Sequence, residues 1–299
     1  MPQYTHLVLS GGGLSGVVYI GAFRYLYEHS LHDSIKTVSG TSIGALFGLL
    51  FVLGVSTEVM ERAFSNLFHD LVSFDITDVF SLATKMGMHP GIDLDKLLEL
   101  IMDVDVNVRR LTFKRLSRKY GKSLQVCATN VATMAPTYFS EETTPDVLVI
   151  DAIRASMAIP IIFMPVTIDG ALYIDGGIVH CIPLGRGRGA STSETLVLSL
   201  STKSHTQYQY PMSEDADVGV GIGNLMTYIS NIINTHIQNQ QAHDIILSKY
   251  PHYILITDIP MHPMSFELHD STVCMTVPQQ VRDCINHGYD VLQKHTMEL

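Results

Sequence analysis

The order of apolar runs and glycines in the first 60 residues limits the fold of this chain more than any other feature. A short apolar run, His6–Ser10, leads into Gly11–Gly13, which is typical of a buried strand that enters a glycine loop. Apolar residues then recur at helical spacing from Val17 to Leu26. A second short strand follows at Ile35–Ser39, and an apolar helix begins after Ser42. This order predicts a βαβ unit, whose two strands are parallel, adjacent and joined by a right-handed crossover.

Strand and helix patterns continue to alternate along the rest of the chain. Periodicity predicts further helices at Asp93–Met102, Thr112–Tyr120, Asp151–Ala158, Asn224–Lys249 and Pro278–Lys294. Short apolar runs predict further strands at Ser123–Thr129, Leu172–Asp175, Thr195–Leu200 and Tyr253–Thr257. The polar stretch Ser201–Gly223 is interpreted as a loop or a boundary. The alternation predicts an α/β fold of three layers, with a mainly parallel central sheet and helices on both faces.

Composition excludes some classes of protein. Hydrophobic residues make up 46% of the 299 residues and charged residues 16%, and the mean hydropathy is +0.21. These values predict a large buried core, as in a parallel sheet covered on both faces. The net charge of −10 argues against a nucleic-acid partner, because neutralising phosphates requires clustered Lys and Arg. The most apolar run, Ile43–Val55, is shorter than the roughly 20 residues of a membrane span, so we expect a buried helix there.

Cysteine spacing and the N-terminal sequence indicate a reducing, cytoplasmic setting. The cysteines are widely spaced and form no CxxC pair, so no disulfide framework is predicted. The N-terminal residues lack the basic region and long apolar stretch of a signal peptide. The sequence contains no HExxH motif, Cys/His cluster or acidic calcium loop, so we predict neither a metal nor another cofactor.

A G-x-S-x-G pentapeptide, Gly40 to Gly44, lies where the second strand meets the apolar helix. This pattern is typical of a nucleophile elbow, in which a serine occupies a sharp strand-to-helix turn and the flanking glycines relieve crowding. The positive end of the helix then favours negative charge near Ser42. The pentapeptide predicts that Ser42 is a nucleophile.

Two further glycine turns supply the other parts of a hydrolytic site. Gly11, Gly12 and Gly13 leave backbone N–H groups free to face an oxyanion, because no Cβ blocks the approach. One crossover separates Gly13 from Ser42, so both turns should emerge side by side at the carboxyl edge of neighbouring strands. Asp175 ends a strand before Gly176 and Gly177, and its carboxylate can serve as a general base for a serine. An Asp-Gly pair also commonly caps a plain turn, so this assignment has a structural alternative.

These blocks, taken in order, resemble a patatin-like phospholipase. Leu7–Gly13 resembles the oxyanion-hole block of that family, and Gly40–Gly44 its nucleophile block. Ala155–Pro160 resembles the Ala-Ser-x-Ala-x-Pro segment before the catalytic aspartate, and Asp175–Gly177 the Asp-Gly-Gly block itself. The resemblance covers residues 6–185. It implies a Ser42–Asp175 dyad, hydrolysis of lipid acyl esters through an acyl-enzyme, and no metal. With a lipid or phospholipid ester as substrate, we also expect transient contact with a membrane surface. We therefore expect a catalytic core over residues 1–200 and a C-terminal extension, residues 201–299, that packs on the same unit.

The chain departs from the family pattern at two places. The family usually has Lys or Arg where this chain has Ser15, and it often has Asn shortly after Asp-Gly-Gly, where this chain has His180 and Cys181. The loss of the basic residue at Ser15 also favours an alternative without catalysis, a lipid-binding or scaffold protein of the same fold.

Two other enzyme classes share parts of the pattern. Gly11-x-Gly13-x-x-Gly16 satisfies a dinucleotide-binding fingerprint, but the second strand does not end in the acidic residue that would bind the ribose. An α/β-hydrolase would pair Ser42 with a histidine such as His243 or His287. Its serine follows more than one βα unit, however, and no histidine here lies in a recognisable block.

Two basic segments stand apart from the glycine motifs. Residues 109–122 carry seven Lys or Arg side chains and no acidic one. Such a run can bind anionic headgroups but more often forms the solvated face of a helix, which we favour. Gly185–Gly189 alternates Gly with Arg and could bind phosphate, although a surface loop is the simpler interpretation.

Overall fold

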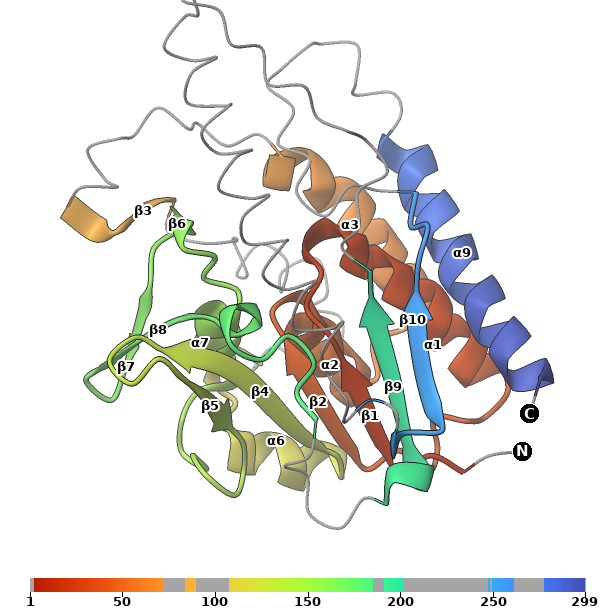
Figure 1. Cartoon of the computed structure of the whole chain (residues 1–299), viewed down its shortest axis with the longest axis horizontal. Helices are drawn as coiled ribbons and strands as arrows, with labels where there is room; N and C mark the ends of the chain where they lie inside the picture. The colour runs from red at the N-terminus through yellow and green to blue at the C-terminus, as the bar shows by residue number, and fades with distance from the viewer. Residues whose placement is uncertain are drawn as a thin grey trace, which may run out of the picture.

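The computed structural model describes residues 3–72, 84–89, 108–184, 191–201, 247, 249–260 and 277–298. In these residues an eight-stranded sheet has the order β10-β9-β1-β2-β4-β8-β7, with β5 also paired to β4. The strands of this sheet are β1 (His6–Leu9), β2 (Thr37–Thr41), β4 (Ser123–Asn130), β5 (Ala135–Phe139), β7 (Val166–Ile168), β8 (Ala171–Asp175), β9 (Thr195–Leu200) and β10 (His252–Ile256). β3 (Gly87–His89) and β6 (Ile161–Phe163) form a separate pair (Figure 1).

The predicted α/β class with a mainly parallel sheet is confirmed. Each pair from β10 through β9, β1 and β2 to β4 is parallel, while β5, β7 and β8 pair antiparallel. The predicted first two strands are adjacent, with Leu9 opposite Gly40. The second strand begins two residues later than predicted, because the N–H of Ile35 bonds to the carbonyl of His32 and closes a turn.

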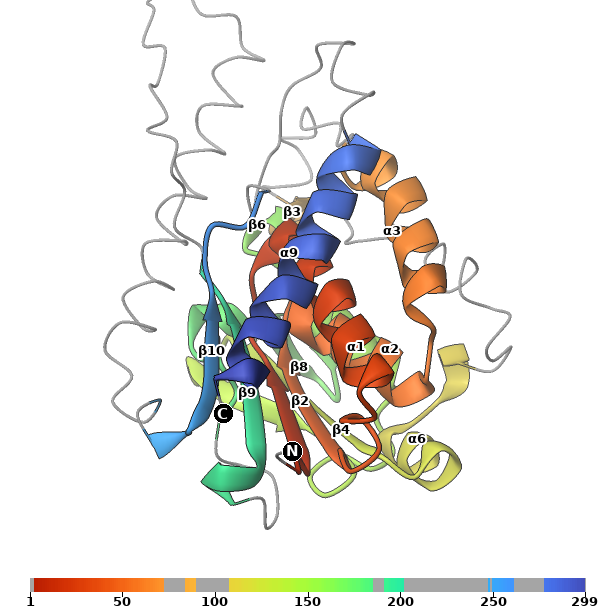
Figure 2. The ribbon, with the colours of Figure 1, turned by 90° about the vertical axis from the view of Figure 1, so that its right-hand side faces the viewer.

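Helices cover one face of the parallel strands in the described part of the chain. They are α1 (Val18–Glu28), α2 (Ile43–Leu53), α3 (Thr57–Val72), α6 (Phe113–Tyr120), α7 (Val149–Ser156) and α9 (Val277–Met297). Figure 2 shows α1, α2, α3 and α9 on the same side of the sheet. Leu7 and Leu9 belong to the main core, whereas Val8 belongs to a second apolar cluster that includes Val197 and Ile182. Because side chains alternate along a strand, both sheet faces are apolar, which explains the uninterrupted apolar runs.

The C-terminal helix packs against the first helix of the chain. α1 and α9 cross so closely that a Cβ on Gly21 would lie 1.7 Å from the carbonyl oxygen of Ile285. Only glycine fits at such a crossing. β10 also extends the sheet beside β9. Residues 252–256 and 277–297 therefore share one hydrophobic core with the N-terminal elements.

Several predicted elements agree closely with the structure. α2 begins at the predicted Ile43 and ends at Leu53, because Gly54 takes the left-handed conformation that closes the helix. It is buried throughout and 11 residues long, as expected of a core helix. No helix in the described ranges combines the length and apolar character that crossing a bilayer would require. The sequence patterns gave no prediction for α3, β3, β5, β6 or β7. The predicted helices Asp93–Met102 and Asn224–Lys249 and the loop Ser201–Gly223 lie largely or wholly outside the described residues.

Candidate active site

Ser42 occupies the single-residue turn between β2 and α2. Its backbone has φ 53° and ψ −126°, which is a strained conformation for a residue with a Cβ. The strain arises because the chain reverses sharply between the strand and the helix. The helix starts at once, since the carbonyl of Ser42 accepts its first hydrogen bond, from the N–H of Ala45. A Cβ on Gly44 would lie 2.5 Å from the carbonyl oxygens of Leu9 and Ser10, so glycine lets α2 start directly against β1.

Asp175 ends β8 and reaches the same point from the other side. β8 pairs with β4, which places Asp175 opposite Ala128, and β4 pairs with β2, which places Cys127 opposite Thr41. The hydroxyl of Ser42 donates a hydrogen bond of 2.6 Å to Oδ2 of Asp175. The two residues are 7% and 5% exposed. The structure thus brings together the two residues that the sequence predicts as a pair, although they are far apart in the chain.

The carboxylate of Asp175 is held on both of its oxygens. Its second oxygen, Oδ1, accepts a 2.7 Å hydrogen bond from the N–H of Gly177. Burial raises the pKa of Asp175 to about 6, and the hydrogen bonds from Ser42 and Gly177 partly oppose this rise. A carboxylate of this pKa is ionised at neutral pH and accepts a proton more readily than an exposed aspartate.

The glycine loop after β1 lies beside Ser42. A Cβ on Gly11 would lie 3.4 Å from the Cβ of Ser42. The N–H of Gly11 donates to the carbonyl of Cys181, so this amide is already used. The amides of Gly12 and Gly13 donate to no acceptor in the described part of the chain. These two N–H groups are therefore the available donors for an oxyanion, while Gly11 fixes the shape of the loop.

The buried hydroxyls of Ser10 and Tyr19 form hydrogen bonds that fix the glycine loop. The hydroxyl of Ser10 donates to the carbonyl of Gly11 (2.8 Å) and accepts from the N–H of Leu200 (2.9 Å). The hydroxyl of Tyr19 donates to the carbonyl of Ser10 (2.9 Å), and it lies 3.2 Å from the carbonyl oxygen of Leu198. The loop is thus attached to β9 and α1, so its free amides keep a fixed direction, as stabilisation of developing charge requires.

Comparison with known proteins decides the family. A family model described as patatin-like phospholipase matches residues 7–186. The chain belongs to this family.

Curated relatives agree with the assignment. The probable lipid hydrolase 463L of Invertebrate iridescent virus 6 is 33% identical over 60% of this chain and 62% of its own length. An uncharacterized protein of Acanthamoeba polyphaga mimivirus is 29% identical over 58% of each chain. Triacylglycerol lipase 5 of Saccharomyces cerevisiae is 28% identical over 53% of this chain and 22% of its own length. The match therefore spans less than two thirds of each of these relatives.

A solved structure supports the fold. The crystal structure of VipD from Legionella pneumophila aligns with a TM-score of 0.56 and 16% identity, over 99% of this chain and 67% of that chain. An identity this low concerns the fold alone.

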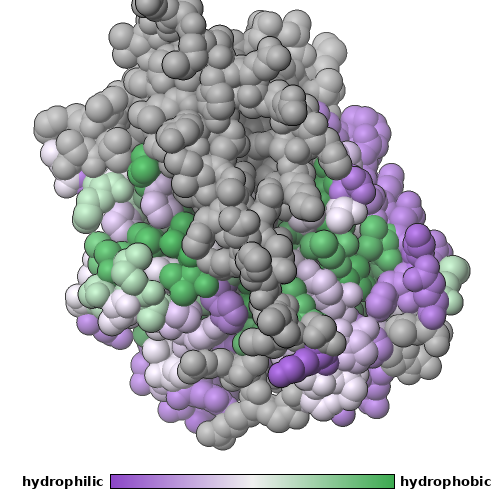
Figure 3. Space-filling model, viewed as in Figure 1, coloured by the Kyte–Doolittle hydropathy of each residue, from purple (hydrophilic) through white to green (hydrophobic). Residues whose placement is uncertain are grey.

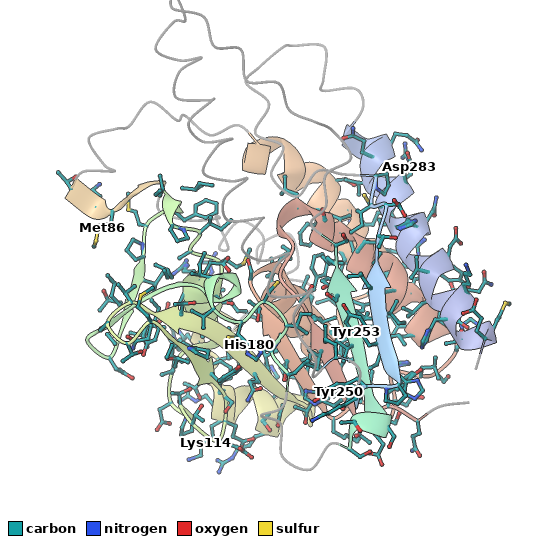
Figure 4. The ribbon with its side chains drawn as sticks, in the orientation of Figure 1. Met86, Lys114, His180, Tyr250, Tyr253 and Asp283 are labelled. Atoms are coloured by element: carbon teal, nitrogen blue, oxygen red, sulfur yellow. The ribbon has the colours of Figure 1, made fainter. Side chains whose placement is uncertain are left out.

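The structure shows where Ser15 and His180, which depart from the patatin-like pattern, lie. Ser15 is buried in the 3-10 turn that follows the glycine loop. The backbone N–H of His180 donates to the carbonyl of Gly176 (2.8 Å), and the carbonyl of His180 accepts a hydrogen bond from the hydroxyl of Thr41 (3.1 Å). Its ring contacts the hydroxyl of Tyr138, and Figure 4 shows it close to β2 and β4. His180 therefore links the Asp-Gly-Gly turn to β2, the strand that leads into Ser42.

Ser156 lies beside Ser42, and the sequence alone indicates no role for it. The hydroxyl of Ser156 accepts a 2.8 Å bond from the N–H of Ser42. The Ala-Ser-x-Ala-x-Pro segment was visible in the sequence, but nothing local showed which group its serine would meet.

The structure describes only some of the remaining candidates. His287 bonds to the carbonyl of Thr257 (2.7 Å), whereas the described acceptor for the Ser42 hydroxyl is a carboxylate. His243 and Gly185–Gly189 lie outside the described residues. Among residues that the structure describes, no three His, Cys, Asp or Glu side chains gather in a way that could hold a metal ion. Cys127, Cys181 and Cys284 form no disulfide in the described part of the chain.

The predicted basic helix is α6. It begins after Thr112, whose hydroxyl caps the N–H of Arg115, and it buries Phe113 and Leu116. Figure 4 shows Lys114 of this helix at the lower edge of the molecule, well separated from His180.

Proposed function

We propose that this protein hydrolyses lipid acyl esters, with Ser42 as nucleophile and Asp175 as general base. The observation that carries the proposal is the 2.6 Å hydrogen bond from the hydroxyl of Ser42, at a strained strand-to-helix turn, to a buried carboxylate. A nucleophile bonded to a base, with oriented amide donors alongside, is the arrangement that acyl transfer requires.

The first half-reaction forms an acyl-enzyme. The Oγ of Ser42 attacks the ester carbonyl carbon while Oδ2 of Asp175 takes the hydroxyl proton. The N–H groups of Gly12 and Gly13 stabilise the negative oxygen of the tetrahedral intermediate. The bond to the alcohol oxygen then breaks, and Asp175 returns the proton to the leaving alcohol.

The second half-reaction releases the fatty acid. Water attacks the acyl carbonyl, and its proton passes to Asp175. The bond to Ser42 breaks as the second tetrahedral intermediate collapses, and the serine recovers its proton. No cofactor takes part in this scheme, and the hydrogen bond from Gly177 keeps the carboxylate aligned for both proton transfers.

The lipid nature of the substrate is proposed from the relatives, two of which are named as a lipid hydrolase and a triacylglycerol lipase. Apolar residues also reach the surface on the face seen in Figure 3, near β10 and near β6 and β7. This surface supports transient contact with a lipid phase. A cytoplasmic location stays a prediction from the sequence.

Turnover of a medium-chain p-nitrophenyl ester, followed by mass spectrometry of products from a mixed lipid extract, tests the proposal. Ser42→Ala and Asp175→Asn should each lower kcat by about 10⁴ or more, as for other nucleophile–base pairs. Ser193→Ala, an exposed serine, serves as the matched control. Lipid binding without turnover in the wild type would instead favour the scaffold role that Ser15 suggests.

A further inference from the structure

The C-terminal end of α7 contacts both members of the Ser42–Asp175 pair. The hydroxyl of Ser156 accepts a 2.8 Å hydrogen bond from the N–H of Ser42 and donates one of 2.5 Å to the carbonyl of Cys127. The side chain of Ser156 is 0% exposed. It therefore joins α7, the nucleophile turn and β4 at one buried point.

The same short segment also holds the backbone of the base. Two residues beyond Ser156, the carbonyl of Ala158 accepts a 2.9 Å hydrogen bond from the N–H of Asp175. Between them, the N–H of Met157 bonds to the carbonyl of Ile153 (3.0 Å), which ties the segment to the last turn of α7. Ser156–Ala158 thus fixes the backbones of the nucleophile and the base relative to each other.

The chemistry of the bridge suits a hydroxyl. A backbone N–H and a backbone carbonyl both face position 156, and only a group that accepts one hydrogen bond and donates another satisfies both. An alanine there would leave the N–H of Ser42 and the carbonyl of Cys127 without these partners in a buried place. The released amide belongs to the residue with the strained backbone, so relaxation would move the nucleophile itself.

We propose that Ser156 is a positioning residue, which sets the geometry between Ser42 and Asp175 without touching the substrate. The proposal rests on the proposed function of this pair. It gives a role to the Ala155–Pro160 segment, which the hydrolytic mechanism above does not use.

The experiment compares Ser156→Ala with Ser39→Ala. Ser39 is a matched control because it is also 0% exposed, and its hydroxyl makes two side-chain hydrogen bonds, to His6 (2.8 Å) and Gln125 (3.2 Å). Both changes remove one buried hydroxyl. For each variant, kcat and KM are measured with a soluble ester, and the rate of Ser42 phosphonylation is measured with a fluorophosphonate.

Ser156→Ala should lower kcat and the phosphonylation rate by about 10- to 100-fold, as a displacement of about 1 Å does, with KM changed less than about threefold. Ser39→Ala should change both rates by less than about threefold. If Ser156→Ala does not fold, Ser156→Cys replaces it, because a thiol is nearly isosteric but only a weak donor and acceptor. Its kcat should still fall by about tenfold.

Each outcome decides one of the two proposals. A kcat for the folded Ser156 variant that matches Ser39→Ala would overturn the positioning role, while the wild-type enzyme stays a hydrolase. A rise in KM with kcat unchanged would also overturn it, since that would place Ser156 in substrate binding. A wild-type protein that shows neither turnover nor phosphonylation would remove the hydrolytic function itself.

Discussion

Replacing Asp175 by asparagine should abolish catalysis and should also change how the free energy of unfolding depends on pH. Burial raises the pKa of Asp175 from 3.8 to about 6 in the folded protein. Between these two values the folded state retains a proton that the unfolded state releases, so the free energy of unfolding falls as the pH rises through this window. The difference of about 2 pKa units corresponds to about 3 kcal/mol, at about 1.4 kcal/mol per unit. The asparagine of Asp175→Asn does not ionise, so this variant should not show the fall in the free energy of unfolding.

Urea unfolding at pH 4.5, 6 and 7.5, followed by circular dichroism, measures the effect. The free energy of unfolding of Asp175→Asn, relative to the wild type, should increase by about 2 kcal/mol from pH 4.5 to pH 7.5, because about 1.5 of the 2 pKa units lie above pH 4.5. Asp290→Asn, at an exposed position of α9, controls for the loss of a surface carboxylate. A difference between Asp175→Asn and the wild type that stays constant across this range would refute the argument that burial raises the pKa of the base.

Three further predictions follow from the site and the fold. The kcat/KM of the wild type should fall about tenfold per pH unit below about pH 6, because protonated Asp175 cannot accept the proton of Ser42; a flat profile down to pH 5 would contradict this. Gly21→Ala should lower the free energy of unfolding by about 1–3 kcal/mol or more, since its Cβ would lie 1.7 Å from the carbonyl oxygen of Ile285, and an unchanged urea midpoint would argue against the close crossing of α1 and α9. EDTA should leave ester turnover unchanged, whereas a loss restored by calcium would reveal a metal site.

Sequence reasoning succeeded where the structure depends on neighbouring residues. Glycines at 40 and 44 around Ser42, and the apolar residues that follow, specify the turn and the helix locally. The parallel pairing of β1 and β2 follows from the short distance between the two strands along the chain. For the same reason the sequence predicts that the glycine loop and Ser42 lie at one edge of the sheet.

The parts that could not be predicted depend on contacts between distant residues. The hydrogen bond from the N–H of Ser42 to the hydroxyl of Ser156 spans 114 positions, and the bond from the N–H of Gly11 to the carbonyl of Cys181 likewise joins remote segments. β5, β6 and β7 are strands of three to five residues with mixed burial, so their pairing partners rather than an alternating pattern specify them. The amide of Gly11, the residue expected to shape the loop, donates to the carbonyl of Cys181, and no local pattern in the sequence indicates that partner.

Labelling with a fluorophosphonate, located by peptide mass spectrometry, tests the central claim most directly. We expect one adduct, on the Oγ of Ser42, that forms at neutral pH, and its formation should be slower by about 10³-fold or more in Asp175→Asn. An adduct on another serine, or a Ser42 adduct that forms equally fast without the carboxylate, would contradict it.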